Sequence, residues 1–224
     1  MKKKSHILLT SRIACRLFAS NDKSLLWGSI LPDFLYYTYL RRHTWETTRK
    51  KIFRKMRRLS CSGSSGAFGA LSALRLGCIL HYIEDYFTYP HNKNFTGTME
   101  EHVKYENEQA RLLSDYLINE KNMDAKSGKY LNFTVTYTNI HDVLSKLEEL
   151  HFEYMNEKAP GMKNDLVYAT RAVSMVCSYY IYAFARNKKR FFEFPACLKA
   201  DYIVDIPGLM AKITFMTQAE RKAA

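Results

Sequence analysis

The chain has 224 residues, a formal net charge of +12 and 47% hydrophobic residues, with only 9 glycines and 5 prolines. This composition excludes an intrinsically disordered chain, and the length suffices for one domain with a sizeable core. The few glycines and prolines favour long helices over a turn-rich β protein. The positive charge favours anionic partners such as phosphates, nucleic acid or an anionic membrane surface, although a basic surface also serves solubility.

The cysteines and the start of the chain bear on its compartment. Five cysteines without a CxxC pair are not the pattern of a disulfide framework or a thiolate zinc site, so buried free thiols in a reducing compartment are favoured. The opening lysines are not followed by an apolar core adequate for a signal peptide, and no apolar run of about 18 residues exists. We therefore expect a cytoplasmic protein, with peripheral membrane contact as an option.

Three stretches in the first half have helical patterns. Apolar residues recur at i, i+4 spacing over residues 6–19, and residues 70–86 are apolar on most faces. Between them, residues 49–58 predict a basic helix with a narrow buried stripe. Its charged face suits an anionic phospholipid surface, a polyanion or plain solvent. Residues 61–69 are rich in serine and glycine and predict a flexible loop.

The second half continues the helical pattern. A capping box over residues 98–101 starts a helix. Residues 121–139 are polar, with a β-prone end, and predict an irregular excursion between helices. Two further helices are expected over about 140–156 and 164–185. Together these elements predict an all-α, single compact multi-helix domain over residues 1–224.

Histidines and carboxylates gather near the middle of the chain. His81 with Asp85, and His102 with Glu106, have i, i+4 spacing, which places an imidazole beside a carboxylate on one helix face. His91 lies between the pairs. Imidazole and carboxylate together suit zinc. Each pair taken alone is more often a surface hydrogen bond on an amphipathic helix.

Three residues upstream share this chemistry. His6 stands at the start of the first expected helix, and His43 follows two arginines. Asp33 follows a proline, whose fixed φ holds the carboxylate at a defined angle as a ligand, a base or a helix N-cap. His81 and Asp85 on an apolar helix would bring a metal site into the core, where a bound cation would offset the cost of burying polar groups.

In this order, the residues resemble the ligand set of the zinc-dependent phospholipase C family, whose trinuclear site is similar to that of the S1/P1-type nucleases. The resemblance rests on the order, on the helical pairs and on the segment Gly28-x3-Pro32-Asp33, and it covers roughly the first half of the chain closely. It implies a fold of the phospholipase C/P1 nuclease type. It also implies the metal ligands His6, Asp33, His43, His81, Asp85, His91, His102 and Glu106.

The resemblance divides these ligands among three metals: Asp33, His43, His81 and Asp85 on one, His91, His102 and Glu106 on a second, and His6 with a bridging Asp85 on a third. In the secreted members, an N-terminal Trp exposed by processing gives its amino group and carbonyl to the third metal. This chain begins with Met1 and three lysines, without a processing signal. We therefore expect two zinc ions, with the third absent, weakly held or completed by water.

The activity that the resemblance implies is cleavage of a phospholipid head group by metal-activated water. In such a site, metals stabilise the charge of the pentavalent transition state and lower the pKa of a bound water from about 15.7 toward 7. Asp33 would orient or deprotonate that water.

Two other functions stay open. A related hydrolase of nucleic acid or soluble phosphate esters fits the same charge, and a non-catalytic metal-binding helical protein fits the same ligands. His141-Asp142 is the HD dipeptide of another metal phosphohydrolase class, with His43 as an earlier ligand, but that assignment leaves the cluster at 81–106 without a role. His151 has no partner at ligand spacing and is expected at the surface.

Overall fold

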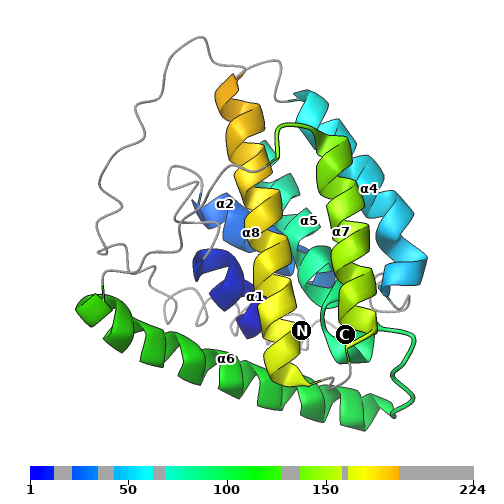
Figure 1. Cartoon of the computed structure of the whole chain (residues 1–224), viewed down its shortest axis with the longest axis vertical. Helices are drawn as coiled ribbons and strands as arrows, with labels where there is room; N and C mark the ends of the chain where they lie inside the picture. The colour runs from blue at the N-terminus through cyan, green and yellow to red at the C-terminus, as the bar shows by residue number, and fades with distance from the viewer. Residues whose placement is uncertain (13–21, 35–42, 63–68, 128–136, 158–160, 187–224) are drawn as a thin grey trace, which may run out of the picture. The chain divides into compact units, whose positions relative to one another are not determined.

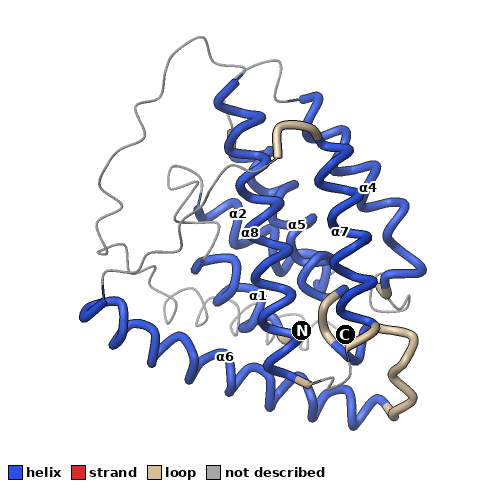
Figure 2. The backbone as a smooth tube through the Cα atoms, viewed as in Figure 1, coloured by secondary structure: helices blue, strands red, loops and turns tan. Residues whose placement is uncertain are grey.

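The structure is a computed structural model that describes residues 1–12, 22–34, 43–62, 69–127, 137–157 and 161–186. Within these ranges, the regular secondary structure is entirely helical, which confirms the all-α prediction (Figures 1 and 2). The α-helices are α1 (Lys3–Thr10), α2 (Asp22–Ile30), α4 (Trp45–Ser62), α5 (Ala70–Tyr86), α6 (Met99–Ser127), α7 (Ile140–Met155) and α8 (Met162–Arg186). Two short 3-10 helices, η3 (Leu31–Phe34) and η5 (Tyr89–His91), lie between them.

Helix α5 is the core element, and its bounds agree with the predicted helix over residues 70–86. It is apolar on most faces, as a helix surrounded by other helices must be. Its contacts are with α1, α2, α4 and α8, and nearly all its side chains from Leu76 onward are buried. The polar residues near its end are therefore held inside the protein.

Helices α2 and α5 make the most extensive contact among the described elements. They cross at two glycines, where a Cβ on Gly28 would lie 2.9 Å from the Cα of Gly77 and 2.2 Å from the carbonyl oxygen of Leu74. Glycine therefore permits an approach that no other residue allows. The close crossing brings the carbonyl of Ser29 to the buried ring of His81.

Helix α4 shows the predicted amphipathic pattern. Ile52, Phe53 and Met56 are buried, as the narrow apolar stripe indicated, and the lysines and arginines between them are exposed. The buried stripe packs against α5, α7 and α8. Since α4 continues to Ser62, the start of the loop expected over 61–69 is helical.

Helix α6 begins with the predicted capping box. The backbone N–H of Glu101 donates to Thr98 Oγ1 at 3.2 Å, and the N–H of Thr98 donates to Glu101 Oε2 at 2.6 Å. The prediction of irregular structure from residue 121 was wrong as far as Ser127, because the sequence has no glycine or proline to end the helix before position 128.

Helices α7 and α8 lie side by side (Figure 1). Their bounds agree closely with the helices predicted over about 140–156 and 164–185. The middle of α8 is buried, as expected of its apolar sequence. No helix in the described part of the chain is both long and apolar enough to cross a membrane. Of the described cysteines, Cys177 is buried and Cys61 is exposed, so the expectation of buried thiols holds only in part.

Some predictions fall outside the described residues. These are the end of the helix expected over 6–19, most of the loop at 61–69, the β-prone part of 121–139, and everything after Arg186. The assignment of residues 1–224 to a single domain therefore stays a prediction.

Candidate metal centre

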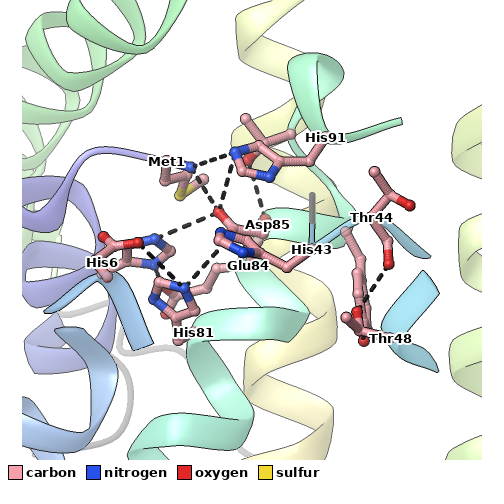
Figure 3. A network of polar contacts seen from close by, with 12 residues as sticks. Met1, His6, His43, Thr44, Thr48, His81, Glu84, Asp85 and His91 are labelled. Atoms are coloured by element: carbon pink, nitrogen blue, oxygen red, sulfur yellow. Dashed lines mark hydrogen bonds and ion pairs between the residues drawn. The ribbon is translucent and has the colours of Figure 1, made fainter. Parts of the chain in front are cut away.

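The structure brings together the side chains of all eight predicted ligands. Figure 3 shows five of them: His6, His43, His81, Asp85 and His91. They are His6 from α1, Asp33 from η3, His43 immediately before α4, His81 and Asp85 from α5, His91 from η5, and His102 and Glu106 from α6. They form four overlapping groups of three, and within each group the candidate ligand atoms lie within 4.8 Å of one another.

Asp85 lies at the centre of the cluster and is 1% exposed. Its Oδ1 lies 3.4 Å from His6 Nε2 and 3.7 Å from His91 Nε2. Its Oδ2 lies 3.3 Å from His81 Nε2 and 3.5 Å from His43 Nε2. Four imidazoles thus converge on one carboxylate, which fits the bridging role that the family resemblance implies.

The second helical pair forms the other end of the cluster. Glu106 Oε1 lies 3.0 Å from His102 Nε2 and 3.1 Å from His91 Nε2. The side chains of His102, His43 and Asp33 are partly exposed, whereas His81 and Asp85 are buried. The cluster is therefore anchored in the core and is partly open to solvent at these three side chains.

The atoms that face Nε2 of His81 fit a cation rather than a hydrogen bond. His81 Nδ1 lies 2.9 Å from the carbonyl oxygen of Ser29, and since a carbonyl only accepts, Nδ1 carries the proton. Burial, and then the charge of His6, lower the His81 pKa to about 3, so the ring is neutral and Nε2 holds a lone pair. That lone pair faces Asp85 Oδ2 at 3.3 Å and Asp33 Oδ1 at 3.6 Å. Acceptors therefore face acceptors.

Several buried nitrogen and oxygen atoms of the cluster lack a hydrogen-bond partner. His6 Nε2, His81 Nε2 and Asp85 Oδ2 have no hydrogen-bond partner. Buried polar atoms are rarely left in this state. Ligand atoms about 2.0–2.2 Å from a tetrahedral zinc ion lie about 3.3–3.6 Å apart, close to the separations around Asp85. The donor set and its spacing both fit zinc.

The α-amino group of Met1 is a member of the cluster that the sequence analysis did not expect. It lies 2.6 Å from Asp85 Oδ1, 3.0 Å from Glu106 Oε1 and 3.2 Å from His91 Nε2 (Figure 3). Burial lowers its pKa, but the surrounding carboxylates outweigh burial and raise the pKa to about 11. When deprotonated, this amine offers a further nitrogen lone pair next to the carboxylate of Asp85.

The charge state of the cluster without metal follows from the same contacts. Burial lowers the His6 pKa, yet Asp85 and Glu84 outweigh it and raise the pKa to about 10. The pKa of Asp85 is well below its usual range, because burial is outweighed by His91, the Met1 amine and the other histidines. Metal ligands must be deprotonated, so metal uptake has to displace protons from the cluster.

Glu84 is a second residue that the sequence analysis missed. It precedes Asp85 on α5 and is completely buried, with its Oε2 2.5 Å from His6 Nδ1. Thr10 Oγ1 donates to its other oxygen, Oε1, at 3.0 Å. An acidic residue inside the apolar stretch over 70–86 was the available signal, because a carboxylate there requires a buried partner.

Two histidines of α7 lie outside the cluster. His151 was expected at the surface, and that prediction was wrong: it is 5% exposed, its ring stacks on Trp45 and its Nε2 bonds Asn92 Oδ1 at 2.9 Å. This face of α7 packs against α4, which sequence spacing does not reveal. His141 and Asp142 are exposed at the start of α7 and belong to none of the groups found among the described residues.

Comparison with known proteins agrees with this geometry. The family model of zinc dependent phospholipase C matches residues 5–161, a range that includes all eight clustered side chains. No curated protein and no solved structure matches the chain. Since the matched range spans well over half of the sequence, the chain belongs to the zinc-dependent phospholipase C family.

Proposed function

We propose that the protein hydrolyses a phosphodiester of a phospholipid head group, with zinc as its cofactor. The observation that carries the proposal is the His81 Nε2 lone pair, buried against the carboxylates of Asp33 and Asp85. A cation between these atoms removes the conflict, and the family supplies zinc as that cation.

We assign the zinc ligands by the groups that the side chains form. Asp33, His43, His81 and Asp85 would hold one ion, His91, His102 and Glu106 a second, and His6 with Asp85 a third. The Met1 amine lies 2.6 Å from Asp85 and adds a donor to the third ion, which has the fewest ligands. Its position therefore supports three ions rather than two.

The chain's own residues then have distinct tasks. Bound zinc would lower the pKa of a coordinated water and neutralise the charge of the phosphate. Asp33 is the partly exposed carboxylate of η3, so it is placed to accept the proton of the attacking water. The buried His81 and Asp85 keep the opposite side of the site free of water, which strengthens every electrostatic interaction within it.

The exposed face of α4 supports contact with an anionic bilayer. The cations on this face are Lys50, Lys51, Arg54, Lys55, Arg57 and Arg58. A basic residue close to an anionic membrane contributes about 1 kcal/mol of binding free energy. A stripe of this kind concentrates a phospholipase on its substrate surface without a membrane span.

The decisive experiment measures zinc content and hydrolysis on untagged protein. We expect two to three zinc ions per chain, loss of zinc and activity in His81→Ala and His102→Ala, and no loss in His141→Ala, an exposed histidine outside the cluster.

Phosphatidylcholine micelles and single-stranded DNA serve as competing substrates. Hydrolysis of DNA alone would replace the proposal with a nuclease. Zinc without any hydrolysis would leave a metal-binding protein, and no zinc after reconstitution would end the metal hypothesis.

Membrane contact needs its own measurement. Sedimentation with phosphatidylcholine vesicles, with and without phosphatidylglycerol, should show binding only to the anionic vesicles. Charge reversal at Arg54 and Arg57 should abolish binding, whereas reversal at Lys163 and Arg171, exposed cations of α8, should preserve it. Equal effects of both pairs would contradict a dedicated surface on α4.

A further inference from the structure

Glu84 is a buried carboxylate next to the metal centre whose two oxygens are both occupied by α1. Oε2 accepts a hydrogen bond from His6 Nδ1 at 2.5 Å, and Oε1 accepts one from Thr10 Oγ1 at 3.0 Å. None of the three residues is exposed to solvent. Both oxygens of Glu84 are thus engaged by α1, and among the described residues Glu84 belongs to none of the candidate metal groups, although it neighbours Asp85 in the sequence.

The ring of His6 lies between two carboxylates. Its Nδ1 edge meets Glu84, and its Nε2 atom, which has no hydrogen-bond partner, lies 3.4 Å from Asp85 Oδ1 (Figure 3). Metal uptake has to remove the proton from Nε2; the proton that stays on Nδ1, held by Glu84, then leaves the Nε2 lone pair directed into the centre. The contact with Glu84 thus decides both the orientation of the ring and which nitrogen can bind metal.

We propose that Glu84 is a positioning residue for the zinc ion that His6 binds, fixing the His6 tautomer and raising its strength as a ligand. A carboxylate that accepts from the second nitrogen of a ligating histidine has this effect in metal sites generally. The inference rests on the proposed zinc centre, and it adds a residue outside the eight predicted ligands.

His6 needs this support more than His81, which is equally buried. His81 lies on the long central helix α5, and its Nδ1 is held by the backbone carbonyl of Ser29. His6 lies on α1, a helix of 8 residues, and its ring is held in place by a side chain of α5. A carboxylate is also a stronger acceptor than a carbonyl, so it makes His6 the more basic ligand.

The test is zinc binding measured against a competing chelator, with Glu84→Gln as the main variant. Glutamine keeps the size and one acceptor oxygen but loses the charge. We expect one zinc ion per chain to bind about 10-fold more weakly in Glu84→Gln, and closer to 100-fold more weakly in Glu84→Ala, with the other ions retained. A general loss of packing would instead weaken every zinc ion together and would overturn the proposal.

Two controls separate positioning from packing. In a His6→Gln background, Glu84→Gln should cause no further loss of zinc, because the residues act as one unit. Thr10→Val removes the other bond of Glu84 and should lower stability with little effect on zinc. Independent losses from His6 and Glu84 would contradict the proposal.

Nitrogen NMR of the histidine rings adds a readout independent of activity. We expect a His6 ring protonated at Nδ1 with Nε2 bound to zinc in the parent, and a mixed tautomer population in Glu84→Ala. An unchanged His6 tautomer would overturn the inference. The failures are distinguishable: a parent without zinc refutes the proposed function, whereas a zinc-loaded parent with an unaffected Glu84→Gln variant refutes only the role of Glu84.

Discussion

Gly28 and Gly77 meet backbone to backbone where α2 crosses α5. A Cβ at Gly77 would lie 2.8 Å from the Cα of Gly28 and 2.1 Å from the carbonyl oxygen of Leu25. Both distances are too short for any side chain. The crossing holds α2 at the distance from which the Ser29 carbonyl reaches His81, so the packing of two glycines sets the orientation of a candidate metal ligand.

We expect Gly77→Ala to destabilise the protein by about 2–3 kcal/mol, because the new methyl group forces the two backbones apart. Helix propensity alone predicts the opposite, a gain of about 1 kcal/mol for alanine inside a helix. Urea unfolding followed by circular dichroism measures the difference. Zinc binding should fall as well, since His81 moves away from Ser29.

The matched control for this prediction is Gly161→Ala. Apart from its chain neighbours, no described residue has an atom within 4 Å of a Cβ at Gly161, so the change should alter stability by less than about 0.5 kcal/mol. Gly77→Ala as stable as the parent would show that α2 and α5 are further apart than described.

Local spacing predicted which candidate ligands share a helix face, because residues four positions apart lie on the same side of a helix. His81 with Asp85, and the apolar helix over 70–86, needed no knowledge of the rest of the chain. Glu84 and His6 are 78 positions apart in the sequence. The periodicity of apolar residues describes single helices and does not predict contacts between residues so far apart. The position of the Met1 amine is of the same kind, since it depends on how α1 packs.

The errors have similar physical reasons. His151 was predicted at the surface because it has no partner at metal-ligand spacing, but such spacing says nothing about burial. It is buried because its ring stacks on Trp45, more than a hundred positions away. The polar residues after 121 looked irregular because polarity was weighed above the absence of a helix breaker. Both cases show tertiary or backbone constraints overriding composition.

Removal of metal should lower thermal stability. A ligand present at about 1,000 times its dissociation constant stabilises a fold by about 4 kcal/mol. For a chain of this size, that corresponds to a fall in melting temperature of about 10 °C after chelation. Scanning calorimetry before and after treatment with EDTA measures it, and added zinc should restore the parent value.

Calcium is the control ion for this experiment. The cluster presents imidazole nitrogens as well as carboxylates, and calcium prefers oxygen ligands alone. Calcium should therefore fail to restore the melting temperature. Full recovery with calcium would mean that the carboxylates alone bind the ion and that the histidines are not ligands.

Asp165 should be among the most costly buried residues to replace outside the metal cluster. Its carboxylate accepts hydrogen bonds from the Tyr89 backbone, Tyr105, Gln109 and Tyr154, and so ties α6, α7 and α8 to the segment before His91. Asp165→Asn places an amide against these donors, and we expect a loss of about 2–4 kcal/mol by urea unfolding.

The matched control for Asp165 is Asp115→Asn, the same change at an exposed position of α6. It should alter stability by less than about 0.5 kcal/mol. Comparable losses in both variants would indicate a general effect of charge, and would remove the special role of the buried carboxylate.

The buried His151 predicts a loss of stability on mild acidification. Burial, together with the charges of Arg49 and Lys93, lowers its pKa from 6.5 to about 3. The unfolded chain binds a proton below pH 6.5 and the folded chain does not, so stability is complete above 6.5 and falls by about 1.4 kcal/mol per pH unit toward pH 3. At pH 5, the loss due to this residue is about 2 kcal/mol.

His151→Phe keeps an aromatic ring against Trp45 but cannot titrate, so its urea stability should fall less between pH 7 and pH 5 than that of the parent. His141→Gln, at an exposed position, should retain the parent slope. Equal slopes for the parent and His151→Phe would show that His151 is protonated in the folded protein and that its burial does not control the pH dependence.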